Sequence, residues 1–382
     1  MHRTGYDTPM APRPHPLSPG EFVVGDTSIT VKQPSLQYRG YRVEDLARES
    51  QFPEVAWLLI EGSLPSPEEL ADLEAALSED GRLDEEVINW LVNLPMHVPG
   101  LDALRTAVSL TATLDPQAQD TSLPAQREKV YRLLARYPIM AAAVVGGTLP
   151  DDAEYHSELS YGGNFLRLAS GIEPRDDHAT AMDALLVVSA DYEYEPSTLA
   201  SRLAAGTRVD VLGALVAALS VFGGECPLDE ARAVADLLDA VNSPEMSLEL
   251  IRRLWEERAI LPGFGPRIPR GGDARVRVLN DWADQLADQA DFEVWEEHAD
   301  WIEAAAWEVA EQGPTLLWTV VRMMKYLGMP VDAAPVVIST GRVAGWMAHY
   351  MEQIRSTWKL RPLGAYIGPI DLQFLPVDDR ST

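Results

Sequence analysis

Apolar residues recur at three- and four-residue spacing through most of this chain. The stretches DEARAVADLLDAV (229–241) and DWIEAAAWEVAEQ (300–312) place their apolar side chains on one helical face. A helix start is expected at Ser66, Pro67 and Glu69, with serine as N-cap, proline at the first helical position and glutamate bonding back to the cap. Only FVVGDTSITVKQPSLQYRGY (22–41), with its β-branched residues and turns, predicts short strands. The sequence therefore predicts an all-α fold with minor β structure near the N-terminus.

Length and charge limit the class of protein. The 382 residues, 46% of them hydrophobic, predict two or three domains with large cores. With 31 basic and 59 acidic residues the net charge is −28, so we expect neither nucleic acid nor a membrane surface as a partner. The apolar run LGALVAALSVFGG (212–224) is too short to span a membrane and predicts a buried core helix.

The N-terminal sequence and the cysteine content indicate in which cellular compartment the protein is located. Residues 1–20 contain five prolines and little apolar periodicity, so we expect a disordered tail. The N-terminus lacks the charged-then-apolar pattern of a signal peptide, and the single cysteine suits a reducing compartment. A cytoplasmic location is therefore expected. The chain contains no CxxC or HExxH motif and no histidine pair at ligand spacing, so no metal site is predicted.

Three segments carry a family resemblance. They are LQYRGYRVEDLA with FPEVAWLLIEGSLPSPEEL (36–70), RVAGWMAHYMEQ (342–353) and LRPLGAYIGP (360–369). The first resembles the start of the helical body of citrate and 2-methylcitrate synthases, and the others resemble that family's ARTVGWLAHILEQ helix and its closing IRPRADYVGP. The resemblance covers roughly residues 20 to 372. It implies a two-domain helical fold, with a large domain from 21–221 and 329–382 and a small inserted domain at 222–328.

The resemblance also places altered residues at the positions of the family's catalytic groups. Where the family has HADHELNAST, this chain has SADYEYEPST (189–198), so Ser189 and Tyr192 replace two histidines while Asp191 is kept. Where it has LHGGANEAV, this chain has GECPLDEAR (224–232). Glu225 then stands at the acid histidine, and Cys226 at the glycine that follows it.

The cofactor loop and the base position differ as well. Where the family has PGFGHRVYKNYDPRA, this chain has PGFGPRIPRGGDARV (262–276), with Pro266 at the second histidine. Leu317 falls at the position of the aspartate base. The loop residues that the chain shares with the family are implied to contact a coenzyme A thioester, and they are Gly263, Phe264, Gly265 and Arg267. We expect the thioester as a substrate and no tightly bound cofactor.

Three arginines match the family's carboxylate-binding positions. They are Arg275, Arg342 and Arg361, the last of which reaches the partner subunit's pocket in the family. A guanidinium pairs with a carboxylate through two parallel hydrogen bonds and keeps its charge. With Ser189, these residues predict a substrate site for a carboxylate in a homodimer. The alternative for each arginine is a surface or ion-pair role.

Four residues are candidates for catalysis, namely Glu225, Cys226, Tyr192 and Asp191. A carboxylate in a partly desolvated cleft can have a pKa near neutrality. Cys226 precedes a predicted helix, whose dipole can lower the pKa of a thiol. The alternatives are structural: a lone cysteine is often a small buried hydrophobe, and Asp191 can support its loop.

Two functional hypotheses follow from these substitutions. In the first, the chain has lost citrate synthase chemistry and is a repurposed condensation, acyl-transfer or cyclisation enzyme that retains the carboxylate pocket. In the second, it is a catalytically inactive, carboxylate-sensing or regulatory partner of an active citrate synthase. Both rest on the expectation that leucine and proline cannot supply an acid or a base.

Overall fold

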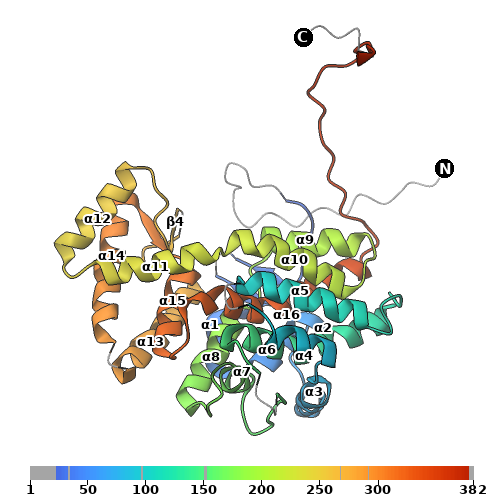
Figure 1. Cartoon of the computed structure of the whole chain (residues 1–382), viewed down its shortest axis with the longest axis horizontal. Coiled ribbons are helices and arrows are strands. Elements are labelled where there is room, and N and C mark those ends of the chain that lie inside the picture. The colour runs from blue at the N-terminus through green and yellow to red at the C-terminus, as the bar shows by residue number, and fades with distance from the viewer. Residues whose placement is uncertain are drawn as a thin grey trace.

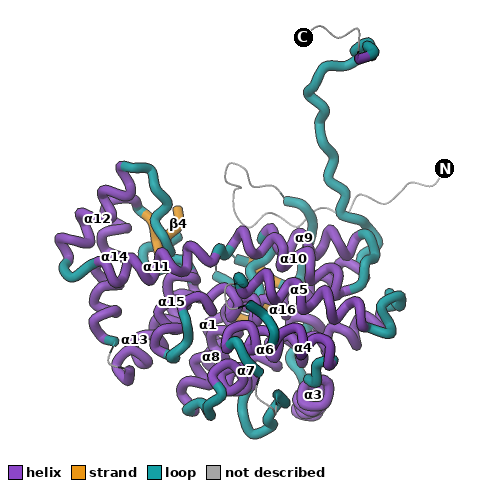
Figure 2. Tube along the Cα trace, in the orientation of Figure 1, coloured by secondary structure: helices purple, strands orange, loops and turns teal. Residues whose placement is uncertain are grey.

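The protein is helical almost throughout, as Figure 2 shows. The computed structural model describes residues 23–32, 35–95, 98–149, 153–266, 268–290 and 292–377. The predicted disordered tail, residues 1–20, lies outside this part of the chain. The α-helices are α1 (Val43–Glu49), α2 (Phe52–Glu61), α3 (Pro67–Asp80), α4 (Glu85–Val92), α5 (Gly100–Leu114), α6 (Leu123–Gly146), α7 (Tyr161–Ser170), α8 (Asp176–Ser189), α9 (Pro196–Gly206), α10 (Val211–Glu225), α11 (Leu228–Ala240), α12 (Pro244–Glu256), α13 (Ala274–Ala290), α14 (Glu293–Ala310), α15 (Leu316–Tyr326) and α16 (Ala334–Arg355).

Local sequence signals set several helix starts. Helix α3 begins with the predicted capping box: Ser66 Oγ accepts from the Glu69 N–H at 3.2 Å, and the Glu69 carboxylate accepts from the Ser66 N–H at 2.8 Å. Ser160 and Asp210 cap α7 and α10 in the same manner through their side-chain oxygens.

The β structure consists of two small antiparallel sheets. Strands β1 (Thr30–Val31), β2 (Gln37–Tyr38) and β3 (Tyr41–Arg42) form the first, as predicted for the N-terminal region. Strands β4 (Phe264–Pro266) and β5 (Gln312–Pro314) form the second, with Gly265 opposite Gly313. The second sheet was not predicted, because three-residue segments of glycine and proline carry no alternating apolar pattern. It joins the loop after α12 to the start of α15.

Helix α16 runs through the centre of the large helical body and packs against α2, α6, α8 and α9. Nearly all of its side chains are buried. Two glycines, Gly341 and Gly345, let it approach the end of α8, since a Cβ at either would overlap backbone atoms of Leu186 or Ala190. The C-terminal end of α8 and the middle of α16 are therefore held in direct contact.

Helix α10 is a core helix, as predicted from its apolar run. By length and composition the stretch Val211–Ala240 could cross a membrane. Within the described structure, however, it is interrupted at Cys226 and Pro227, which separate α10 from α11. Helix α10 packs against α5, α9 and α16 in the helical body.

Two further parts of the molecule extend from this body in Figure 1. Helices α11 to α15 gather at one end, beside the β4 strand. The segment that follows α16 leaves the body as an extended arm. The predicted division into a large domain and a small domain at 222–328 stays a prediction.

Candidate active site

The contact between α8 and α16 positions Arg342 beneath the loop that follows α8. Its Nε donates to the Ser189 carbonyl oxygen at 2.8 Å, and the side chain is only 4% exposed. Neither Nη atom forms a hydrogen bond with a described residue. Arg342 is thus fixed through Nε, and its two Nη nitrogens remain available to donate hydrogen bonds to a carboxylate. Ser189 contributes its backbone to this arrangement, and its hydroxyl is fully buried.

Asp191 belongs to a buried ionic network rather than to an open surface. Its Oδ2 accepts from the Glu193 N–H at 3.0 Å and lies 3.3 Å from His349 Nε2. On the other side of the ring, Arg202 Nη1 lies 2.8 Å from His349 Nδ1 and 2.6 Å from Glu352. Burial alone would raise the pKa of Asp191, but His349, Thr30 and Arg342 hold it below its ordinary value. Asp191 is therefore a buried anion that fixes the loop after α8.

Tyr192 lies between two cations. The Arg275 guanidinium carbon is 3.5 Å from the centroid of the ring, and Lys32 Nζ is 4.0 Å from it. The phenol donates to Asp273 Oδ2 at 3.2 Å. Burial is the largest influence on the phenol and raises the pKa of Tyr192, so the hydroxyl remains protonated at neutral pH.

Arg275 is oriented by the residue two positions before it. Its Nε and Nη2 donate to the Asp273 carboxylate, the Nη2 bond being 2.6 Å long. Asp273 Oδ1 also accepts from the backbone N–H of Arg275 at 2.9 Å, which is an N-cap contact at the start of α13. Burial alone would raise the pKa of Asp273, but Arg275 and Tyr192 hold it below its ordinary value. Asp273 thus stays ionised and neutralises part of the charge of Arg275.

Glu225, the last residue of α10, points to the start of α9. Its two carboxylate oxygens accept from the Ser197 N–H at 2.6 Å and from the Ser197 hydroxyl at 2.7 Å. Trp346 on α16 donates to the same hydroxyl at 3.2 Å. Burial raises the pKa of Glu225, while Ser197 and Arg342 act in the opposite direction. Glu225 is therefore an oriented carboxylate whose proton affinity is higher than that of an exposed glutamate.

Cys226 does not have the lowered pKa that its place before a helix predicts. The residue is 6% exposed and belongs to the hydrophobic core. Burial raises the pKa of the thiol to about 12, with Glu230 adding to the effect. Desolvation outweighs the helix dipole here, so Cys226 is a protonated core residue at neutral pH.

The loop implied to contact a thioester is buried between α11 and α15. Gly263 has a positive φ of 77°, and a Cβ there would meet Trp318 at 2.8 Å. The Phe264 ring lies 4.7 Å from the Trp318 ring. Packing against Trp318 thus accounts for Gly263 and Phe264, and Gly265 is also buried. Arg267 lies outside the described residues, and the contact of this loop with a thioester stays a prediction.

Pro266 is the last residue of β4, and Leu317 is the second residue of α15, shortly after β5. Leu317 is 6% exposed at the start of α15, and Pro266 is exposed in β4 opposite Gln312. Leu317 is part of the hydrophobic core. Neither side chain has an ionisable group, so neither can exchange a proton.

Arg361 does not join the other two arginines within one chain. It lies in the exposed arm that leaves the body after α16, as Figure 1 shows. Arg275 and Arg342, by contrast, are both buried, and both lower the pKa of the buried Tyr38, which burial raises. Two of the three predicted carboxylate ligands are therefore buried within the chain, and their convergence on one carboxylate stays a prediction.

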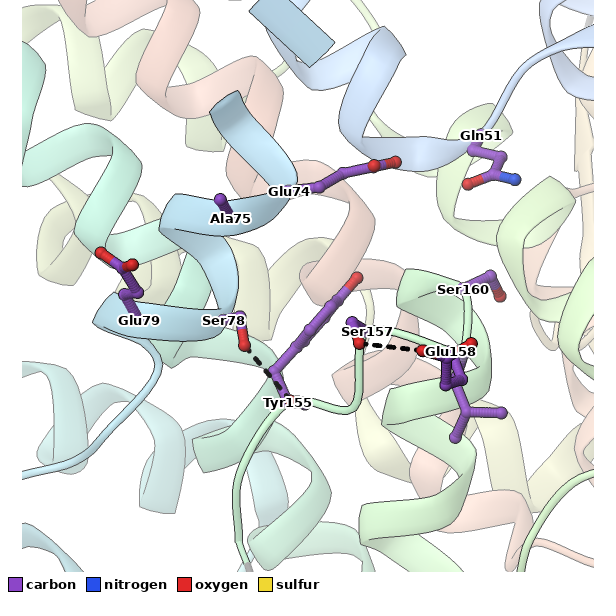
Figure 3. A pocket seen from close by; sticks show the side chains of 10 residues that line it. Gln51, Glu74, Ala75, Ser78, Glu79, Tyr155, Ser157, Glu158 and Ser160 are labelled. Atoms are coloured by element: carbon purple, nitrogen blue, oxygen red, sulfur yellow. Dashed lines mark hydrogen bonds between the residues drawn. The ribbon is translucent and has the colours of Figure 1, made fainter. Parts of the chain in front are cut away.

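A sizeable cavity lies elsewhere on the protein. It has a volume of about 590 Å³ and is bounded by α3 and the segment before α7 (Figure 3). Its wall includes Glu74, Glu79 and Glu158 and none of the predicted site residues. A carboxylate substrate would be repelled there, so this cavity is not the predicted substrate site.

Sequence reasoning missed four residues of the site. They are Lys32, Asp273, Ser197 and Trp346. Asp273 could have been found, because an aspartate two residues before a predicted substrate arginine at a helix start is a cap signal. Ser197 and Trp346 lie in two segments matched to the family, SADYEYEPST and RVAGWMAHYMEQ, but nothing in those segments marks them as site residues. Lys32 lies in none of the matched motifs.

Comparison with known proteins defines the class of protein. Residues 20–363 match the family model described as "Citrate synthase, C-terminal domain". Citrate synthase 2 of Bacillus subtilis is 28% identical over 94% of this chain and 98% of its own length. The 2-methylcitrate synthase of Mycobacterium tuberculosis is 30% identical over 91% of this chain and 88% of its own length.

Solved structures agree with this match. The citrate synthase of Pyrobaculum aerophilum has a TM-score of 0.81 at 25% identity, covering 94% of this chain and 93% of that one. A Thermoplasma acidophilum citrate synthase solved as a ternary complex has a TM-score of 0.83 at 23% identity, covering 94% of this chain and 97% of that one, and shows the same fold. The chain belongs to the citrate synthase family, an enzyme family.

These relatives correct the functional hypotheses drawn from the sequence. The expectation that the chain has lost citrate synthase chemistry is wrong, because relatives matched over nine-tenths of its length are named as citrate and 2-methylcitrate synthases. The same finding overturns the repurposed-enzyme and inactive-partner hypotheses. The error lay in treating proton transfer as tied to particular side chains, whereas this site contains other ionisable groups.

Proposed function

We propose that this protein condenses an acyl-CoA thioester with a 2-oxo dicarboxylic acid, the reaction named by its citrate and 2-methylcitrate synthase relatives. The new bond joins the carbon next to the thioester to the keto carbon. One proton leaves the thioester carbon and one is gained by the keto oxygen. Water then cleaves the thioester, and coenzyme A leaves as the thiol.

The observation that carries this proposal is a pair of buried, fixed arginines, one of which, Arg342, also acts on the oriented carboxylate of Glu225. Arg342 is held by the Ser189 carbonyl and has two outer nitrogens free of bonds to described residues. Arg275 stacks on Tyr192 and is held by Asp273. Two fixed guanidinium groups provide the charge that a dicarboxylate needs when it leaves water.

Glu225 is the proposed proton acceptor. Its raised pKa makes it a stronger base than an exposed glutamate, and Ser197 holds both of its oxygens. Each oxygen keeps a second lone pair for the thioester proton. A positioned base of this kind contributes about 10²–10⁴-fold in rate. Tyr192, whose raised pKa keeps it protonated, is the proposed hydroxyl donor to the substrate, once its O–H turns away from Asp273.

The proposal extends to assembly and location. The arm after α16 contains exposed apolar side chains, among them Ile367, which is 97% exposed, and Phe374, which is 81% exposed. Such a segment is stabilised when it packs on another subunit. We therefore propose a cytoplasmic homodimer in which the arm brings Arg361 to the partner's site.

The test is release of free thiol from acetyl-CoA or propionyl-CoA with oxaloacetate as the acceptor. We expect turnover of about 1 s⁻¹ or faster, with citrate or 2-methylcitrate identified by mass spectrometry. The Glu225→Gln variant should lose at least about 10²-fold in kcat, whereas Glu68→Gln, on exposed α3, should match the parent. Absence of thiol release above background with either thioester would refute the proposal.

The pH dependence gives a second readout for Glu225. A base must be deprotonated to act, so kcat/KM should fall as the pH drops through the raised pKa of Glu225. The pH at which kcat/KM has fallen to half should lie above the ordinary glutamate pKa of about 4.3. The Glu225→Gln variant should keep some residual activity, and that activity should not fall over this pH range. An unchanged fall in the variant would assign the base to another group.

A further inference from the structure

A second cavity lies at the junction of α5, α6 and α10, away from the proposed active site. Its volume is about 220 Å³. Three cationic side chains of α6 line it, namely Lys129, Arg132 and Arg136. Residues three, four and seven apart lie on one face of a helix, so these cations are stacked along a single wall.

Two of the three cations already form close ion pairs with carboxylates of the chain. Lys129 is 1% exposed, lies 3.3 Å from the Asp115 carboxylate and donates to the Gln117 carbonyl oxygen at 2.6 Å. Arg136 pairs with Asp84 at 3.0 Å through Nη1. These contacts tie the ends of α4 and α5 to α6.

Arg132 is the least compensated of the three, and its side chain is 23% exposed. Its Nη2 is buried and has no hydrogen-bond partner among the described residues. The nearest carboxylate oxygen, on Asp115, is 3.9 Å away, and Asp115 is also shared with Lys129. A buried guanidinium donor without a partner is costly, and a like charge four residues further along the helix adds repulsion.

We propose that this cavity binds a small dianion, of the phosphate or dicarboxylate type, through Arg132 and Arg136. The dianion accepts from the buried Arg132 Nη2 and from the face of Arg136 turned away from Asp84. Three cations against Asp84 and Asp115 leave one positive charge at the cavity, and one of the two negative charges of the ligand compensates it. The volume is below the roughly 300–1,000 Å³ of pockets for larger ligands, so nucleotides are excluded.

The site is built into the packing of the large body. Gln126 on the same helix accepts from the Val211 N–H and from the Tyr350 hydroxyl, both at 2.8 Å. Helix α6 is thus bonded to α10 and α16. Binding at Arg132 therefore stabilises the folded chain, and the stabilisation grows with the logarithm of the ligand concentration once that concentration exceeds Kd.

The experiment titrates sodium phosphate and sodium succinate, with sodium chloride at equal ionic strength as the blank. Binding is followed by calorimetry and by the melting temperature in the full-length Arg342→Ala protein, which removes a main ligand of the proposed active site. In this background we expect saturable binding of at least one dianion. Adding Arg132→Gln should weaken that binding at least about tenfold.

The matched control is Arg82→Gln, since Arg82 pairs with Glu154 on the surface and its side chain is 80% exposed. It should bind as the background protein does. Arg132→Lys keeps the charge but loses the planar fork, so it should also bind more weakly, and it replaces Arg132→Gln if that variant does not fold. The tighter of the two anions identifies the ligand type. No saturable binding of either anion, or equal binding with and without Arg132, would overturn the proposal and leave the proposed condensation activity untouched.

Discussion

The junction of α8 with α16 and the arm after α16 contain parts of the same predicted site but are stabilised in opposite ways. At the junction, Arg342, Asp191 and His349 are almost fully buried and are fixed by contacts within the chain. In the arm, Arg361 and the apolar residues that follow it are exposed. One half of the site is thus preorganised by packing, and the other half requires a second surface. The proposed dimer supplies that surface.

The largest effect is expected from Gly345, which holds the junction together. Alanine at this position would overlap the Ala190 carbonyl oxygen and the Asp191 side chain. Alanine favours a helix by about 1 kcal/mol, but overpacking costs about 1–3 kcal/mol and sometimes more. Because the contact with Ala190 is with a backbone oxygen, we expect a cost above that range. We expect Gly345→Ala to lower the free energy of unfolding in urea and to reduce activity.

The arm offers a matched control for this substitution. No atom lies within 4 Å of the Cβ position at Gly364. Gly364→Ala should change the free energy of unfolding by less than about 0.5 kcal/mol. Equal effects at the two glycines would remove the contrast between the junction and the arm.

The next effect concerns the arginines. Removing a charged hydrogen-bonding partner from a carboxylate costs about 1.5–3 kcal/mol, or roughly 10–150-fold in kcat/KM. Arg342→Ala should show this loss in thiol-release kinetics. Arg361→Ala should show a comparable loss without lowering the melting temperature, whereas Lys359→Ala, two residues away, should match the parent. Full activity in Arg361→Ala would exclude the arm from the site.

The sequence predicts contacts between residues that are close along the chain better than contacts between residues that are far apart. Helical periodicity and the capping signal at Ser66 are local, and both were sufficient to predict the helices. The pair of Asp191 with His349 spans 158 positions, and the stacking of Lys32 on Tyr192 joins a strand region to the loop after α8. Such contacts depend on how helices pack, which no local spacing encodes. For Cys226, the local position before a helix predicted the wrong direction of the pKa shift, because burial depends on the whole fold.

The smallest effect is a dependence of stability on pH. The pKa of Asp191 is lower in the folded protein than in the unfolded chain. Its contribution to stability is therefore present above the unfolded pKa of about 3.9 and is lost as the pH falls through the folded pKa. Asp191→Asn should destabilise the protein at pH 7, and the difference from the parent should shrink under acid conditions. A constant difference from pH 7 to pH 3 would mean that the Asp191 charge is not what stabilises the loop.

Complementation is the most direct test of the central claim. The claim is that each site is built from the α8–α16 junction of one chain and the arm of the other. Arg342→Ala and Arg361→Ala chains are unfolded together, refolded as an equal mixture and assayed for thiol release. If the arm serves the partner, each mixed dimer contains one intact site, and random pairing should restore about a quarter of the parent activity. If the arm serves its own chain, the mixture should be no more active than the average of the two variants, and the account would be contradicted.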